Sequence, residues 1–258
     1  MIPTNCRGIP KHYPKPKSTQ DRAEIKKLSL FDWIARFSFT STSIVAEIWG
    51  VDPSVVNRAL RRYVNEGYLT EVPITCCRDK RLFILKPKAV KYINNYHLTP
   101  IRYNTKRSNL PLKVINHELV VQLFLALNIT SGKFFYFITE KEQEKDNKGK
   151  NRRVDAIVFD IELGEMIAIE VECSSKSIPH RVDLLKKYQK ALIDDKLYTR
   201  VVFVSFKRRH LRDCERVNNK ILTKDEGVFF KTEQLSSCLK YLYNKQVMAI
   251  LFHKIWDF

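Results

Sequence analysis

Three acidic residues in the second half of the chain have types and spacing that suit metal chemistry. Asp155 stands at the start of one apolar run, and Glu170 and Glu172 lie two residues apart in the next. Because side chains alternate between faces along a β-strand, Glu170 and Glu172 are expected to point the same way. Carboxylates on neighbouring strands can converge on one cation, and such oxygen ligands suit Mg²⁺ or Mn²⁺. The sequence therefore predicts a metal site of Asp155, Glu170 and Glu172.

The surroundings of these acids add basic candidates. The run IAIEVEC is otherwise apolar, which predicts a buried strand, and a buried Glu170 is costly unless it is paired or metal-bound. Lys176, four residues beyond Glu172, or Lys187 on the following helix is expected to stabilise charge that develops on a phosphate. Glu118 lies upstream on a predicted helix, where it joins the metal site or simply pairs with a surface lysine.

An α/β element pattern surrounds the acids. Apolar runs predict strands over 133–139, 153–159, 166–173 and 200–206, with a tight turn at 162–165. Helical spacing predicts helices over 113–127, 181–193 and 233–243, and Tyr188 is expected in the core. The charged stretch 140–151 is predicted to be a solvated loop. These elements predict a central mixed β-sheet flanked by helices.

The first half of the chain contains the pattern of two short helices joined by a tight turn. A first helix is expected over 23–37, and Ser41 or Thr42 is expected to cap a second helix that ends before Gly50. Asp52 and Pro53 then provide an N-cap and a first-turn proline for a third helix, which Gly67 ends. This is a helix-turn-helix arrangement.

A predicted hairpin follows, with strands over 68–72 and 81–85 and its turn near 78–80. Three helices and a hairpin over about 24–95 resemble the winged-helix domain, whose recognition helix enters the DNA major groove. We therefore expect the third helix and the hairpin to contact DNA, because their serine, asparagine, arginine and lysine side chains can bind base edges or phosphates. The predicted DNA-binding residues are Ser54, Asn57, Arg58, Arg61, Arg62, Lys80 and Arg81. The alternatives are an ordinary solvated helix face or a protein-docking module.

Composition agrees with a polyanionic partner. The formal net charge is +18 among 258 residues, and lysine or arginine set against phosphates releases counterions. No apolar run is long enough to span a membrane, and the first residues lack the apolar core of a signal peptide. Six scattered cysteines without a CxxC spacing predict reduced thiols, no zinc site and a cytoplasmic location.

The second half also carries a family resemblance. Asp155 followed by Glu170-Val171-Glu172 resembles the PD-(D/E)xK restriction-endonuclease-like fold, in which an aspartate and a (D/E)xK strand bind the metal and the lysine helps to activate water. This sequence departs from the pattern at Glu172, where the family motif has lysine. The resemblance implies Mg²⁺- or Mn²⁺-dependent hydrolysis of a DNA phosphodiester, with Lys176 or Lys187 replacing the motif lysine.

The chain has a predicted winged helix, then the helix that carries Glu118, then Asp155 with Glu170 and Glu172, and then the helix that carries Lys187 and Tyr188. This order is similar to that of the replication-relaxation family and of plasmid mobilisation relaxases of the MobC type. The resemblance implies a site-specific nickase of a plasmid transfer origin, with relaxosome or coupling proteins as partners and no membrane partner. The expected organisation is a basic arm over 1–22, a winged helix over 23–97, a linker over 98–112 and a nuclease-like domain over 113–258. Two alternatives are a non-catalytic DNA-binding regulator or relaxosome accessory protein, and a transposase-type end-cutting subunit.

Overall fold

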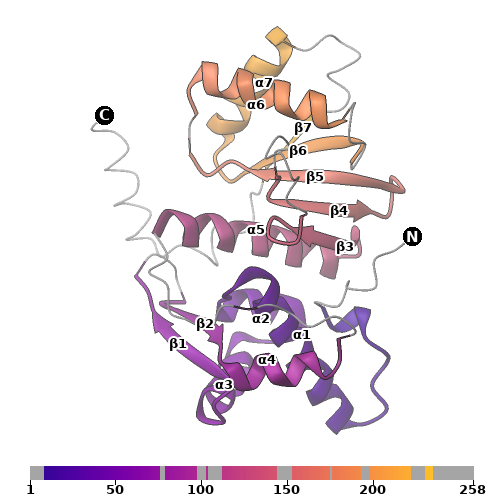
Figure 1. The fold of residues 1–258 in the computed structure, drawn as a ribbon, viewed down its shortest axis with the longest axis vertical. Helices are drawn as coiled ribbons and strands as arrows, with labels where there is room; N and C mark the ends of the chain where they lie inside the picture. Colours follow the sequence, from indigo (N-terminus) through magenta and orange to yellow (C-terminus); the bar gives the residue numbers. More distant parts are fainter. Residues whose placement is uncertain are drawn as a thin grey trace. The chain divides into compact units, whose positions relative to one another are not determined.

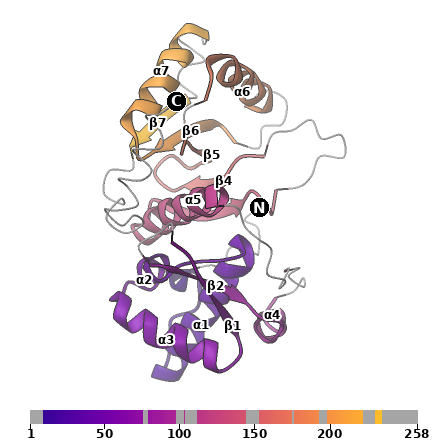
Figure 2. The ribbon, with the colours of Figure 1, turned by 90° about the vertical axis from the view of Figure 1, so that its left-hand side faces the viewer.

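The computed structural model of the chain describes residues 9–75, 79–97, 103, 112–143, 153–174, 176–192, 198–221 and 230–234. These residues form two compact units, which meet along the chain between Thr130 and Ser131. Figure 1 labels the α-helices and β-strands of both units, and Figure 2 shows the same ribbon turned by 90°. No helix within the described ranges is both long enough and apolar enough to cross a membrane.

The first unit is mainly helical. A short 3₁₀ helix, η1 (Pro10–His12), precedes five helices and one antiparallel hairpin. The helices are α1 (Thr19–Phe37), α2 (Thr42–Trp49), α3 (Pro53–Asn65), α4 (Pro87–Asn94) and α5 (Leu112–Thr130). The hairpin pairs β1 (Leu69–Pro73) with β2 (Arg81–Leu85), and Leu69 lies opposite Leu85.

The expected C-terminal end of α2 and both expected ends of α3 are confirmed, whereas Ser41, at the N-cap of α2, makes no side-chain capping bond. Gly50 follows α2 with φ +61°, a left-handed conformation that costs glycine little. Asp52 is the N-cap of α3, its carboxylate accepts a hydrogen bond from the Ser54 amide at 2.8 Å, and Pro53 occupies the first turn. Gly67, with φ +76°, follows the end of α3.

The start of the chain differs from the expected arm over 1–22. The helix α1 begins at Thr19, because the Ser18 hydroxyl caps it by accepting from the Asp21 amide at 3.0 Å. Ile9 is buried, and Tyr13 donates a hydrogen bond to the buried carboxylate of Asp32. Residues 9–13 therefore pack against the first unit, whereas residues 1–8 of the predicted arm lie outside the described residues.

Helix α5 belongs to the first unit, whereas the sequence pattern assigns it to the second domain. It packs along α2, and its buried Gln122 accepts from Trp33 Nε1 at 2.8 Å while donating to the Phe39 carbonyl at 2.9 Å. Thr130 at its end donates to Glu47 at 2.9 Å. Of the predicted linker over 98–112, the structure describes Leu112, which begins α5, and Tyr103, which donates to the Ser38 carbonyl at 2.5 Å.

The second unit is built on a five-stranded sheet of order β3-β4-β5-β6-β7. The strands are β3 (Phe134–Thr139), β4 (Ala156–Asp160), β5 (Glu165–Val171), β6 (Arg200–Ser205) and β7 (Phe230–Gln234). The pairs β3–β4 and β4–β5 are antiparallel, whereas β5–β6 and β6–β7 are parallel. The predicted mixed sheet is thus confirmed, and the tight turn between β4 and β5 includes Gly164 at φ +65°.

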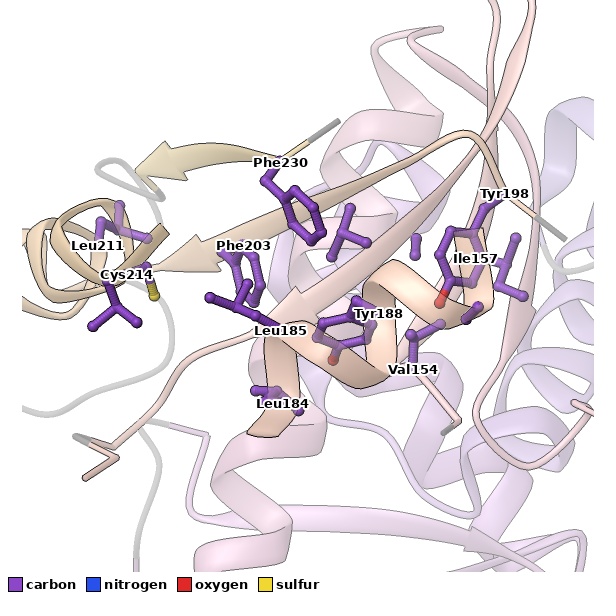
Figure 3. Close-up of a cluster of buried hydrophobic side chains, with 14 residues drawn as sticks. Val154, Ile157, Leu184, Leu185, Tyr188, Tyr198, Phe203, Leu211, Cys214 and Phe230 are labelled. Atoms are coloured by element: carbon purple, nitrogen blue, oxygen red, sulfur yellow. The ribbon is translucent and has the colours of Figure 1, made fainter. Parts of the chain in front are cut away.

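Two helices cross between the parallel strands and pack on one face of the sheet. They are α6 (Ile178–Lys190) and α7 (Arg208–Ile221). Figure 3 shows their apolar side chains in one buried cluster with those of the sheet, including Leu185 of α6, Cys214 of α7 and Phe203 of β6. Tyr188 is fully buried there, as predicted, and its ring meets that of Phe203 edge to face.

Besides the short η1, three described elements have no counterpart among those expected from the sequence. They are α4, α7 and β7. The helix predicted over 233–243 begins instead with the last residues of β7, and its remainder, 235–243, lies outside the described residues. The charged stretch 140–151 is described up to Gln143, which exchanges two hydrogen bonds with the main chain of Val154.

Candidate functional site

The predicted acids come from adjacent strands of the second unit. Ala156 of β4 pairs with Ile169 of β5, so one step further along this antiparallel register Asp155 stands opposite Glu170. Asp155 is half-buried at a bend just before β4, rather than inside the strand, and its Oδ2 accepts from the Val171 amide at 2.6 Å. Glu170 is buried in β5. The geometry thus brings Asp155 and Glu170 to neighbouring positions at one end of the β4–β5 hairpin.

Lys176 lies between the two glutamates. Its Nζ is 2.7 Å from Glu172 Oε1 and 3.6 Å from Glu170 Oε1. One ammonium can approach both carboxylates only if they project to the same side, so the predicted shared orientation of Glu170 and Glu172 is confirmed. Of the two lysines proposed for this site, Lys176 is therefore the one that the fold brings to the acids.

Glu172 is the most enclosed of the three acids. Its side chain has no solvent exposure, and Arg181 Nη1 of α6 lies 3.9 Å from its Oε1. Its Oε2 is buried without a hydrogen-bond partner in the described structure. Because burial of an ion is compensated only by close opposite charge, Lys176 and Arg181 are what make a charged Glu172 tolerable.

The main chain of Glu172 is also held from β6 and α7. Ser205 donates to the Glu172 carbonyl at 2.6 Å, and His210 Nδ1 lies 3.3 Å from the same oxygen. The Glu172 amide donates to the Val204 carbonyl at 2.7 Å, which extends the β5–β6 pairing beyond the end of β5. The position of Glu172 is thus fixed by elements that follow it in the chain.

Burial controls the protonation of the groups nearby. Desolvation lowers the pKa of His210, and the Lys207 charge adds to this effect although the Glu172 carbonyl opposes it, which favours a neutral imidazole. Burial raises the pKa of the Cys173 thiol to about 12, with further contributions from Asp155 and Glu172. Cys173 is therefore a protonated thiol at neutral pH and not a nucleophile.

The donor set fits a metal ion through two carboxylates rather than three. Among the residues that the structure describes, no group of three or more histidine, cysteine, aspartate or glutamate side chains is arranged to hold a metal ion. Asp155 and Glu170 stand opposite one another and offer the oxygen donors that Mg²⁺ and Mn²⁺ prefer. Glu172 is engaged with Lys176 and Arg181. Metal binding itself stays a prediction.

The two other predicted catalytic residues stand on helices, Lys187 on α6 and Glu118 on α5. Lys187 is exposed on α6 and pairs with Asp183 one turn away at 2.7 Å, with both side chains more than half exposed. This pairing gives no support to the role predicted for Lys187 at the acids. Glu118 lies half-buried on α5 and belongs to the first unit, so its predicted role at the metal stays a prediction.

In the first unit, helix α3 presents most of the predicted DNA-binding side chains to solvent. Ser54, Arg58, Arg61 and Arg62 are exposed, whereas Asn57 is half-buried and accepts from the Thr42 hydroxyl at 3.1 Å. Arg62 lies 3.7 Å from Glu66, one turn further along. The opposite face of α3 is buried through Val56, Leu60 and Tyr63. One face of α3 is therefore packed in the core of the first unit, and the opposite face is basic and exposed to solvent.

The β1–β2 hairpin is tied to α2 by its own turn. Asp79 accepts from the Ser43 amide and from the Ser43 hydroxyl, each at 2.7 Å. This carboxylate caps α2 from the hairpin, since Ser41 makes no side-chain capping bond. Of the two predicted hairpin contacts, Lys80 is exposed, and Arg81 is partly engaged by Glu71 at 3.3 Å.

A cavity of about 290 Å³ opens beside α3. Its lining includes two aromatic side chains, Trp49 and Tyr63, and three basic ones, Lys26, Arg58 and Arg62. Lys26 lies over the Trp49 ring at 5.5 Å from its centroid, and Arg62 lies over Tyr63 at 5.1 Å. The cavity extends the basic surface of α3 toward α1.

Several residues around the acids have no signal in the sequence. Arg181, Ser205 and His210 reach Glu172 from α6, β6 and α7. An arginine within a helix start and a serine at the end of an apolar strand are common, so their types alone carry no information about the site. The one usable indication is topological, because parallel β5 and β6 bring Ser205 beside the end of β5.

Comparison of the chain with protein-family models, with curated proteins and with solved structures gives no match.

Proposed function

We propose that the chain is a DNA-binding protein with a winged-helix reader in its first unit and a DNA endonuclease of the PD-(D/E)xK type in its second. Within that class we propose a nickase that acts in plasmid mobilisation. The observation that carries the endonuclease is the contact of Lys176 with both buried glutamates, next to Asp155. It provides an acid pair and an ammonium in one place, although position 172 lacks the lysine of the motif.

The residues take separate roles in this proposal. Asp155 and Glu170 hold the divalent cation, which supplies a more acidic water and neutralises charge on the phosphate. Lys176 carries a positive charge that can meet the attacked phosphate. Glu172 is too enclosed to be a principal metal ligand, and we assign it to holding Lys176 in place.

The reader is supported by the outer face of α3 and by the charge of the chain. Arg58 and Arg61 are exposed on α3, and no salt bridge is found for either among the described residues. Each phosphate contact that is lost should reduce the slope of log K against log salt by about 0.9. We expect Arg58→Gln/Arg61→Gln to reduce this slope by about 1.8 if both side chains contact phosphates, while Lys91→Gln on the exposed side of α4 leaves it unchanged.

Nicking of supercoiled plasmid DNA tests the catalytic part. The full chain is incubated with Mg²⁺ or Mn²⁺ at low salt, alongside Asp155→Asn, Glu170→Gln and the exposed-turn control Glu162→Gln. We expect the wild type and the control to nick, and the two site variants to lose at least about 100-fold in rate. Binding to a short labelled duplex, measured in parallel, should be the same for all four proteins.

A second candidate function is a DNA-binding protein without catalysis. It is favoured by the ion pairs themselves, because Lys176 and Arg181 neutralise the buried glutamates without a metal. If the wild type binds DNA but nicks no faster than Asp155→Asn, and calorimetry shows no Mn²⁺ binding, this second function replaces the first.

A further inference from the structure

Helix α7 has a cationic outer face that the proposed function does not use. Its inner residues are buried and include Leu211, Cys214 and Val217, which belong to the apolar cluster of Figure 3. Its exposed basic residues, hereafter the α7 cationic face, are Arg208, Arg209, Arg212, Arg216 and Lys220. At 3.6 residues per turn these five fall within an arc of about 120°.

The arrangement of charge on α7 is unfavourable for an isolated helix. Arg208, Arg212, Arg216 and Lys220 follow one another at intervals of four residues, so each cation stands one turn from another. Like charges at this spacing weaken a helix. A surface that only had to be soluble would interleave acids along the same line, so the stripe indicates an anionic partner.

The acids of α7 do not neutralise this face. Asp213 lies 3.5 Å from Arg216 in an exposed contact, and Glu215 accepts from the Thr232 hydroxyl of β7. By helical position both acids flank the cationic arc rather than interrupt it. For the four other cations of the face no salt bridge is found in the part of the chain that the structure describes.

The inner side of the same helix contacts the acidic site. His210 Nδ1 lies 3.3 Å from the Glu172 carbonyl, and the Cys214 thiol accepts from Arg181, the residue that approaches Glu172. The main-chain amide of Lys207, just before α7, donates to Ser205, which in turn holds Glu172. The helix therefore starts at the site and leads away from it, with its cations on the outside.

We propose that the α7 cationic face binds the phosphates of the DNA that occupies the acidic site, as a second nucleic-acid contact separate from α3. From Arg208 to Lys220 the helix rises about 18 Å, which is the length of about five base-pair steps of a duplex at about 3.4 Å of helix axis each. Arginine to phosphate contacts position a duplex without selecting its sequence. The face thus aligns the strand at the acids, whereas α3 selects the site. This inference rests on the proposed binding of DNA.

Salt-dependent binding of a labelled duplex by the full chain tests the inference. The test variant is Arg208→Gln/Arg212→Gln, and the matched control Lys186→Gln/Lys190→Gln removes two exposed charges from α6 of the same unit. Loss of two phosphate contacts reduces the slope of log K against log salt by about 1.8. When salt is raised from about 50 to about 200 mM, the factor by which affinity falls should therefore be about 12 times smaller for the test variant than for the wild type. The control should keep the wild-type slope, and Arg208→Lys/Arg212→Lys should restore it.

The outcomes separate this inference from the proposed function. If the wild type binds DNA and the test variant keeps the wild-type slope, the α7 contact is wrong while the reader stands. The α7 contact is also wrong if the α6 control changes the slope as much as the test variant does, because the effect would then be one of net charge. If the wild type does not bind DNA at all, the proposed function falls and the inference with it.

Discussion

Removal of the Lys176 ammonium is the most direct test of how the acidic site is held together. In Lys176→Met the buried Glu170 and Glu172 lose a charge that lies 3.6 and 2.7 Å from them. At an effective dielectric constant near 20 these attractions amount to about 5 and about 6 kcal/mol, most of which is offset by desolvation of the ions. Loss of one partner from a buried pair has a net cost of about 3–5 kcal/mol.

Two features of the structure suggest that the net cost of Lys176→Met lies at the lower end of this range of about 3–5 kcal/mol. The Lys176 side chain is 21% exposed, and the variant keeps Arg181, whose Nη1 lies 3.9 Å from Glu172 Oε1 in the wild type. We therefore expect the second unit to lose about 3 kcal/mol of stability. The matched control is Lys187→Met, because the exposed pair of Lys187 with Asp183 should contribute less than about 0.5 kcal/mol.

Native-state hydrogen exchange, followed by mass spectrometry of peptides from β5 and β6, measures this change within the second unit. A double-mutant cycle with Glu172→Gln isolates the pair, and we expect a coupling energy of about 2 kcal/mol. A coupling below about 0.5 kcal/mol, or an equal effect of Lys187→Met, would show that Lys176 does not stabilise Glu172.

Three further predictions concern other parts of the molecule. Asp79→Ala removes the carboxylate that caps α2 at Ser43 and should lower the free energy of unfolding of the first unit by about 1 kcal/mol. Urea unfolding followed by tryptophan fluorescence measures this change, and an unchanged midpoint would refute the cap. Because burial lowers the pKa of His210, the unfolded state binds the extra proton, so stability should fall as pH drops below about 6.5, and His210→Gln should flatten that decline in thermal melts. Since burial raises the pKa of Cys173 to about 12, iodoacetamide at about pH 8 should label it far more slowly in the native protein than in urea, and equal rates would contradict its burial.

Sequence patterns are sufficient for elements whose ends carry their own chemistry. Gly50, Asp52 and Pro53 delimit α2 and α3 through backbone preferences that act locally, and the structure confirms them. The strands β4, β5 and β6 are likewise visible as apolar runs. Partners that are distant in the sequence cannot be recognised from such local patterns. Asp79, for example, caps α2 from a turn 36 residues beyond Ser43.

In the second unit, three features were not predictable from local sequence patterns. Helix α7 has few apolar residues among many charges and is not among the predicted elements, although its buried and charged residues separate cleanly onto two faces. The pattern predicts Asp155 inside a strand, but its carboxylate bonds the Val171 amide and it stands at the entrance of β4. The sequence leaves Lys176 and Lys187 as alternatives, and only the contacts of the folded chain distinguish them, since Lys176 lies at Glu172 whereas Lys187 pairs with Asp183.

The order of strands has a consequence for how the acidic site is assembled during folding. Asp155 and Glu170 lie on a hairpin closed by a short turn, so they meet through a local contact that forms early. Arg181, the cation of α6 that lies near Glu172, joins the site only with the crossover that carries α6. Asp155 and Glu170 are therefore brought together before Arg181 completes the charge balance of the site. We expect folding of the second unit to slow at low ionic strength, where the repulsion between the carboxylates is least screened.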